Sequence, residues 1–114
     1  MNVALFVFNG DPMCFIHVLL NALDMDAKGC NAHIVMEGAS VKLVPELVKP
    51  EHPLHNLFTQ AMQKDLVAGA CRACSVKLGV DKAVQEAGVE LIGDMNGHPS
   101  MLSYIDQDYE VITF

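Results

Sequence analysis

The chain has 114 residues, of which 14 are acidic and 7 are basic, so its formal net charge is −7 at neutral pH. Hydrophobic residues make up 52% of the chain and charged residues only 18%, a balance that predicts one folded domain and excludes a disordered tail. The chain has no cluster of Lys or Arg, so we expect neither nucleic acid nor an anionic membrane surface as a partner, because both attract concentrated positive charge.

The first third of the chain predicts a strand, a helix and a second strand. Residues 2–8 form an apolar run rich in Val and Phe, which is typical of a strand buried on both faces. Asp11 and Pro12 suit the start of a helix, and apolar residues at helical spacing continue it over residues 13–28. Residues 32–36 form the next apolar run, which completes a β-α-β unit.

The rest of the chain predicts short helices between three further strands. Three prolines exclude one long helix over residues 40–64, which we therefore divide into two helices at residues 42–48 and 54–64. The expected strands lie at residues 66–70, 89–92 and 110–114, and the expected helices at 75–78, 81–87 and 99–105. This alternation predicts an α/β fold with a mostly parallel five-stranded sheet and helices on both faces.

The N-terminal apolar run has no basic leader and ends after about seven residues, so it does not resemble a signal peptide. No other apolar stretch reaches the roughly 20 residues that a membrane crossing needs. We therefore expect a cytoplasmic protein. Its four cysteines are then reduced thiols rather than disulfide staples, because a chain with this much apolar core does not need them.

The reactive side chains are concentrated in the loops that follow the predicted strands. In parallel α/β sheets, ligands bind beyond the carboxyl ends of the strands. The corresponding loops here span residues 9–14, 37–40, 71–74 and 94–98. We therefore expect a site built from Cys71 and Cys74, with a pocket formed by Asn9, Asp11, Cys14, Glu37 and His98.

Cys71 is the main candidate for chemistry because it lies where a strand gives way to a helix. The positive end of that helix dipole is expected to lower the pKa of the thiol and to raise its thiolate fraction. His98 is the second candidate, since an imidazole can donate to a sulfur anion or carry a proton near neutral pH. The alternative is that Cys71 is an inert thiol packed at the end of its strand.

Cys74 follows Cys71 at CxxC spacing, which suits either a redox disulfide or two ligands to one metal ion. Zinc or another soft metal would need further ligands beside Cys71 and Cys74, and Cys14 and His98 are the candidates. The chain has no GxGxxG motif, no P-loop and no serine nucleophile elbow, so it lacks the usual signals of dinucleotide binding, P-loop hydrolysis and α/β-hydrolase chemistry.

The chain resembles the DsrE/DsrF-like proteins, which include the sulfur-relay subunits of the Tus and Dsr systems. Three segments carry the resemblance: Phe8-Asn9-Gly10, Glu37-Gly38-Ala39, and Ala70-Cys71-Arg72-Ala73-Cys74-Ser75-Val76-Lys77-Leu78-Gly79-Val80. The most specific feature is a cysteine at the end of the third strand followed, eight positions later, by the glycine of a Gly-Val pair. The resemblance covers the chain in element order and length, and identifies residues 1–114 as a single DsrE/DsrF-like domain.

This resemblance implies a three-layer, flavodoxin-like fold, assembly into homo-oligomers such as trimers or hexamers, and no organic cofactor. In the sulfur-relay members of the family, the cysteine that matches Cys71 accepts sulfur as a persulfide. The chain departs from a single-cysteine carrier because it also has Cys74. With two thiols, Cys74 is able to attack a Cys71 persulfide, release sulfide and leave a disulfide.

Three hypotheses about function follow. In the first, the protein is a sulfur carrier or a sulfurtransferase: Cys71 accepts sulfane sulfur from a donor protein or a small sulfur species and passes it on, Cys74 is a resolving thiol, and Asp11, Glu37 and His98 shape the pocket. In the second, the protein binds a metal ion or a small ligand through Cys71 and Cys74. In the third, the cysteines are packed, and the chain is an oligomeric interaction protein without sulfur-transfer activity.

Overall fold

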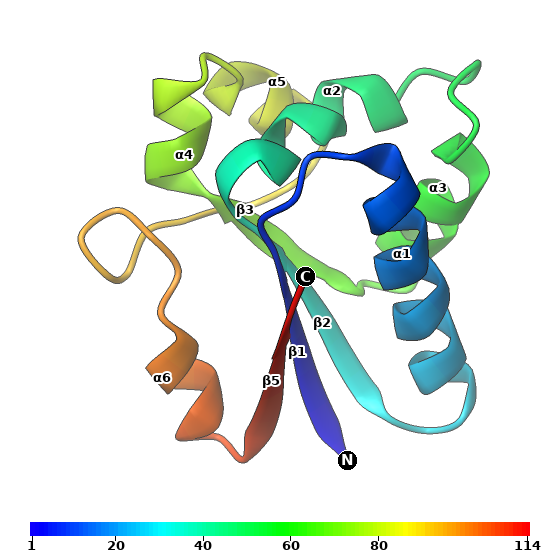
Figure 1. Ribbon diagram of the computed structural model, residues 1–114, viewed down its shortest axis with the longest axis vertical. Coiled ribbons are helices and arrows are strands. Elements are labelled where there is room, and N and C mark those ends of the chain that lie inside the picture. Colours follow the sequence, from blue (N-terminus) through cyan, green and yellow to red (C-terminus); the bar gives the residue numbers. More distant parts are fainter.

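The computed structural model describes all 114 residues and contains five strands and seven helical segments (Figure 1). The strands are β1 (Asn2–Val7), β2 (Asn31–Met36), β3 (Val67–Cys71), β4 (Leu91–Ile92) and β5 (Tyr109–Thr113). The helices are α1 (Pro12–Ala27), α2 (Val44–Leu47), α3 (His55–Gln63), α4 (Arg72–Lys77), α5 (Asp81–Glu86) and α6 (Met101–Ile105), with a 3-10 helix η1 (Gly38–Leu43) before α2. None of these helices has the length and apolar character required to span a membrane.

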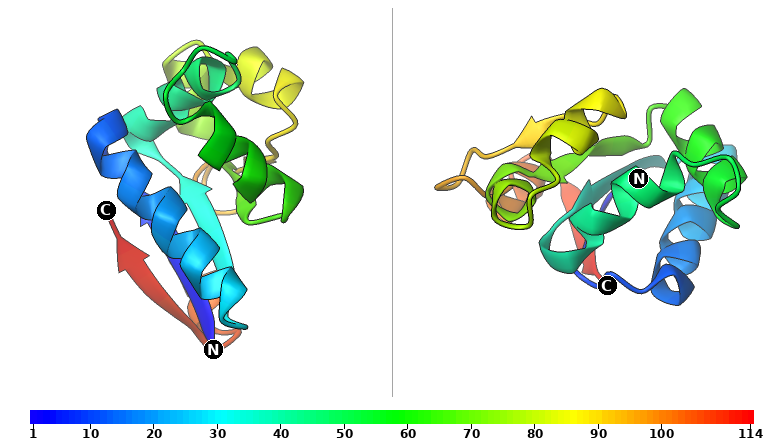
Figure 2. Two further views of the ribbon diagram at one scale, coloured as in Figure 1. Left: turned by 90° about the vertical axis from the view of Figure 1, so that its right-hand side faces the viewer. Right: turned by 90° about the horizontal axis from the view of Figure 1, so that it is seen from above.

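The five strands form one parallel sheet in the order β4-β3-β2-β1-β5. From β1 to β4 each strand is added beside the previous one, so the crossovers step in one direction and their helices share one face of the sheet. The connection from β4 to β5 runs back across the sheet, and its helix α6 lies on the opposite face (Figures 1 and 2). The predicted three-layer, flavodoxin-like α/β fold is therefore confirmed.

Alternate residues of the interior strand β1, which lies between β2 and β5, contribute to two different hydrophobic cores. Val3, Leu5 and Val7 belong to the large hydrophobic core, which the buried side of α1 also enters. Ala4 and Phe6 point to the other face and form a small core against α6. Successive side chains of a strand point to opposite faces of the sheet, and here both faces are covered. Neither set of side chains faces solvent, so β1 is apolar from Val3 to Val7.

The segment after β2 differs from the prediction. A helix was expected at residues 42–48, whereas the chain forms η1 directly after Glu37 and then the short helix α2. Gly38 has a φ of +54°, a conformation that favours glycine and lets the chain turn at once. The buried hydroxyl of Ser40 then donates to the carbonyl oxygens of Val7 and Glu37, at 2.7 and 2.8 Å, and ties η1 to the end of the sheet.

The segment after β3 also differs from the prediction, because Cys71–Cys74 is not a loop. Cys71 is the last residue of β3, and α4 begins at the next residue. The Sγ of Cys71 accepts a hydrogen bond from the backbone N–H of Cys74 at 3.3 Å, and so serves as the cap of the helix. The buried Ser75 hydroxyl donates to the carbonyl oxygen of Cys71 at 2.7 Å. Both cysteines are thereby held by regular structure.

The remaining differences are shifts of element boundaries. β4 has two residues, where a strand was expected over residues 89–92. Helix α6 begins at Met101 rather than at residue 99, because the Ser100 hydroxyl accepts a hydrogen bond from the N–H of Ser103 and caps it there.

Candidate functional site

The carboxyl ends of β3 and β4 form the point at which the topology of the sheet reverses. The chain leaves β3 toward α4 on one face of the sheet and leaves β4 toward α6 on the other face. Neighbouring strands whose connections leave to opposite faces create the crevice in which α/β proteins bind their ligands. Cys71 is the last residue of β3, and the loop after β4 carries His98. The strand order thus brings these two residues together.

Four side chains meet in this crevice, and we call them the Cys-His-Glu cluster: Glu37, Cys71, Cys74 and His98. One ligand atom from each lies within 4.8 Å of the other three. The Nδ1 atom of His98 is 3.1 Å from the Sγ of Cys71, 3.8 Å from the Sγ of Cys74 and 4.0 Å from the Oε1 of Glu37. The side chains come from the end of β2, the end of β3, α4 and the β4–α6 loop.

A tight turn places His98 in the cluster. Met95 and His98 exchange two backbone hydrogen bonds of 2.8 and 2.9 Å across Asn96 and Gly97, whose φ angles are +50° and +91°. Positive φ at both central residues is the pattern of a type I′ turn, for which Asn-Gly is the preferred sequence. The carbonyl of Gly97 accepts the N–H of Ala73 at 2.9 Å and joins the turn to α4. The Asn-Gly pair is the sequence signal for this turn.

The two cysteines of the cluster differ in solvent exposure. Cys71 has no exposed surface, whereas Cys74 is partly exposed. Burial, together with the neighbouring Cys74 thiol and Glu37 carboxylate, raises the pKa of Cys71 to about 12, although the N–H of Cys74 acts in the opposite direction. The expected lowering of this pKa by the helix is therefore wrong, because desolvation outweighs the hydrogen bond from the start of α4. At rest Cys71 is a neutral thiol.

Glu37 is the buried carboxyl group of the cluster, with 7% of its surface exposed. Burial raises its pKa, and the nearby imidazole of His98 lowers it. The carboxylate forms no hydrogen bond, and its nearest basic group is the His98 ring at 4.0 Å. The His98 side chain is 44% exposed and so lies between the buried thiol of Cys71 and solvent.

Three of the residues expected in the pocket lie outside the cluster: Asn9, Asp11 and Cys14. The side chain of Asn9 accepts the N–H of Asp11 at 2.8 Å, and Asp11 in turn accepts the N–H of Met13 at 2.9 Å and caps α1. Cys14 lies partly buried in the first turn of α1. The expected metal-ligand set contained Cys14 together with Cys71, Cys74 and His98. In the structure, Glu37 takes the place of Cys14 beside the other three residues.

A groove of about 330 Å³ borders the cluster and reaches two of its members, Glu37 and His98. Glu37 and His98 are its only titratable side chains, and it contains no Lys or Arg. Its lining is mainly apolar and comprises Phe8, Glu37, Met95, His98, Pro99, Ser100, Met101 and Leu102.

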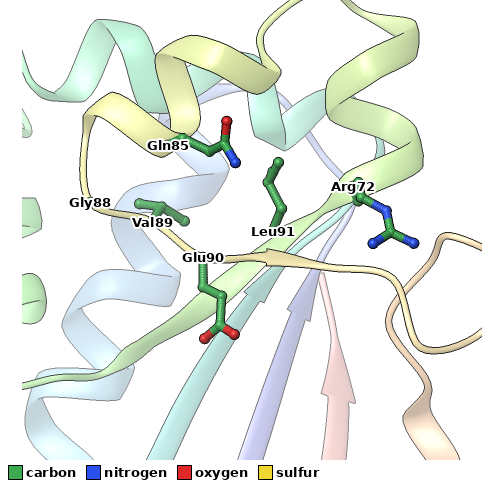
Figure 3. Close-up of a pocket in the computed structure, with 6 residues that line it drawn as sticks. All are labelled: Arg72, Gln85, Gly88, Val89, Glu90 and Leu91. Carbon is green, nitrogen blue, oxygen red and sulfur yellow. The ribbon is translucent and has the colours of Figure 1, made fainter.

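The largest cavity of the molecule, about 480 Å³, lies elsewhere, beside β4 (Figure 3). It is lined by Arg72, Gln85, Gly88, Val89, Glu90 and Leu91, and so contains neither a thiol nor an imidazole. Figure 3 shows the guanidinium of Arg72 directed away from Gln85 and Val89. It donates to the carbonyl of Gly93 at 3.5 Å. Arg72 follows Cys71 in sequence, but it is not a member of the Cys-His-Glu cluster.

Two comparisons place the chain among known proteins, while no protein-family model matches it. The structure of BT1422, a conserved protein of unknown function from Bacteroides thetaiotaomicron, is similar over 99% of this chain and 94% of that chain, with a TM-score of 0.73 and 16% sequence identity. This likeness shows the fold alone. The uncharacterized protein MJ0733 of Methanocaldococcus jannaschii is 31% identical over 97 residues, which are 85% of this chain and 77% of that protein. At this identity and coverage, the chain belongs to the same family as MJ0733.

Proposed function

We propose that this protein is a cytoplasmic sulfur carrier of the DsrE/DsrF-like class, which accepts sulfane sulfur as a persulfide on Cys71 and relays it to an acceptor. The observation that carries the proposal is the 3.1 Å separation between the buried Sγ of Cys71 and the Nδ1 of His98, at the topological reversal of the sheet. A nucleophile within hydrogen-bond reach of a base is the arrangement that covalent catalysis uses. The carrier is proposed to work as a homo-oligomer, a trimer or hexamer, with donor and acceptor partners.

His98 supplies the base that loading requires. Because the pKa of Cys71 is raised to about 12, the thiol does not ionise at neutral pH without a proton acceptor. As a persulfide donor R–S–SH approaches, the Nδ1 of His98 accepts the thiol proton, and the Cys71 thiolate attacks the outer sulfur. The bond between the two donor sulfurs breaks, Cys71–S–SH forms, and R–S⁻ leaves.

The sulfur leaves Cys71 by one of two balanced steps. In relay, an acceptor thiolate attacks the outer sulfur of Cys71–S–SH, becomes a persulfide and releases the Cys71 thiolate. In resolution, the Cys74 thiolate attacks the inner sulfur, so that HS⁻ is released and a Cys71–Cys74 disulfide remains. Cys74 suits the second step because it is partly exposed and belongs to the same cluster.

The charge of the site favours a donor of low charge. The groove beside the cluster has the carboxyl group of Glu37 but no Lys or Arg, and the whole chain carries a formal charge of −7. A dianion such as thiosulfate meets stronger repulsion there than a persulfide, whose apolar group also fits the apolar lining. The donor class is therefore proposed to be an apolar organic or protein-bound persulfide.

Intact-mass spectrometry tests the carrier function. Reduced, metal-free protein is incubated with benzyl persulfide generated in solution, and the wild type is compared with Cys71→Ser and Cys74→Ser, with Cys14→Ser as the matched control outside the cluster. We expect a mass gain of one sulfur atom that a reductant removes, in the wild type and Cys14→Ser but not in Cys71→Ser. Equal sulfur uptake by Cys71→Ser, or none by the wild type, would contradict the proposal. Cys74→Ser is expected to hold its persulfide longer.

A further inference from the structure

We propose that the Cys-His-Glu cluster is also a zinc site, with Glu37, Cys71, Cys74 and His98 as its four ligands. Two thiolates at CxxC spacing, an imidazole and a carboxylate are all established zinc ligands, and four is the number that a closed tetrahedral site requires. Metal binding uses the same two thiols as the proposed sulfur carriage, but it needs neither a sulfur donor nor an acceptor.

The separations of the ligand atoms fit a tetrahedron. Zinc lies about 2.3 Å from sulfur and about 2.0–2.1 Å from nitrogen or oxygen, so neighbouring ligands are roughly 3.3–3.8 Å apart. From the Nδ1 of His98, the two sulfurs lie at 3.1 and 3.8 Å, and the Oε1 of Glu37 lies at 4.0 Å. No pair in the cluster exceeds 4.8 Å. Closing these atoms around one ion therefore takes only small side-chain movements, of about 1 Å at most.

One hydrogen bond at the Nδ1 of His98 does not account for all three neighbours of that atom. The Nδ1 of His98 faces both thiols and the carboxylate, yet a ring nitrogen has either one proton to donate or one lone pair to accept with. In a catalytic triad, the nucleophile and the orienting carboxylate contact opposite nitrogens of the imidazole. Here they share one nitrogen. Several ligand atoms directed at one point are the arrangement that a metal ion needs.

A bound cation would also explain why the Glu37 carboxylate lies in this partly buried position. The residue Glu37 is 7% exposed, and its carboxylate has no hydrogen bond and no Lys or Arg partner, so a negative charge there is only partly solvated. A bound zinc ion supplies the missing counter-charge. The two thiolates select a soft or borderline metal such as zinc over magnesium or calcium, which prefer oxygen ligands only.

Zinc titration of the reduced, chelator-treated protein tests the site, with native mass spectrometry as the readout. We expect one zinc ion per chain in the wild type and in Cys14→Ser, whose altered thiol lies outside the cluster. Cys74→Ser and Glu37→Gln are expected to weaken binding by about tenfold or more, since even the residues that only orient zinc ligands typically contribute 10–100-fold. Circular dichroism of the metal-free variants shows whether each is folded.

Cobalt(II) substitution provides a second readout that does not depend on affinity. A site with two thiolates gives sulfur-to-cobalt charge-transfer bands and the intense d–d absorption of tetrahedral cobalt, and both bands should decrease in Cys74→Ser. Absence of stoichiometric zinc in the wild type, or unchanged binding in both Glu37→Gln and Cys74→Ser, would overturn the proposal. Sulfur uptake is measured separately on metal-free protein, so failure of the zinc site and failure of sulfur carriage are distinguishable.

Discussion

Replacing Gly97 by alanine tests whether the Asn-Gly turn holds His98 in the cluster. The φ of Gly97 is +91°, and left-handed backbone costs an L-residue roughly 1–2 kcal/mol. The new Cβ would lie 3.2 Å from the Cβ of Ala73, which is closer than ordinary contact, so the turn must also shift by a few tenths of an ångström. We expect Gly97→Ala to lose about 1–2 kcal/mol of unfolding free energy. We also expect it to weaken both zinc binding and sulfur loading, because His98 follows Gly97 directly.

Gly29→Ala is the matched control for this substitution. Gly29 has a similar φ of +85°, but no atom lies within 4 Å of its would-be Cβ, and it follows α1 outside the cluster. Urea denaturation of both metal-free variants should show the backbone cost in each, whereas zinc titration and persulfide loading should change only in Gly97→Ala. If Gly97→Ala takes up zinc and sulfur as Gly29→Ala does, the turn does not position His98.

Four further predictions follow from the surroundings of Cys71. Ser75→Ala removes the buried 2.7 Å hydrogen bond to the Cys71 carbonyl and should lower the unfolding free energy by about 1–2 kcal/mol, measured in urea with an unchanged slope. In reduced, metal-free protein, iodoacetamide should modify Cys74 before Cys71, because the pKa of Cys71 is raised to about 12. The rate of Cys71 modification should rise about tenfold per pH unit. Equal rates for the two cysteines at neutral pH, measured by peptide mass mapping, would contradict this. Because an unfolded thiol ionises from about pH 8.5 while folded Cys71 stays neutral, the unfolding free energy should fall between about pH 8.5 and 12, and less so in Cys71→Ser. Benzyl persulfide should load Cys71 faster than the dianion thiosulfate does, and Glu37→Gln should reduce the difference. Equal rates in the wild type would exclude the proposed preference for an apolar persulfide donor.

The strands and most of the helices could be predicted from the sequence. The strands are short apolar runs, and the first helix has apolar residues at helical spacing. β1 is apolar from Val3 to Val7, and β2 is apolar from Ile34 to Met36, because both faces of these strands are covered there. The strand order could not be predicted, since residue spacing does not encode which strands become neighbours. The short η1 was missed for a similar reason: the Ser40 hydroxyl that fixes it bonds to Val7, on a strand more than 30 positions earlier in the chain.

The same limit explains which of the expected site residues the structure brings together and which it does not. The rule about strand carboxyl ends selects one edge of the sheet but no point along that edge. The cluster forms where β3 and β4 diverge, and β2, which ends at Glu37, is the next strand. β1 lies one strand further, and neighbouring strands are about 4.8 Å apart, so the loop of Asn9 and Asp11 begins about 10 Å from the end of β3. The pKa of Cys71 was wrongly predicted because its burial arises from tertiary packing, which the local strand-to-helix pattern does not contain.

The formal charges of the cluster explain why its two thiolates need a metal ion. Zinc with two thiolates and the Glu37 carboxylate has a formal charge of −1. Two thiolates without a metal would instead give −3, which burial strongly disfavours. Zinc removal should therefore be accompanied by uptake of about two protons, and a persulfide on Cys71 should exclude zinc, because both states use the same sulfur.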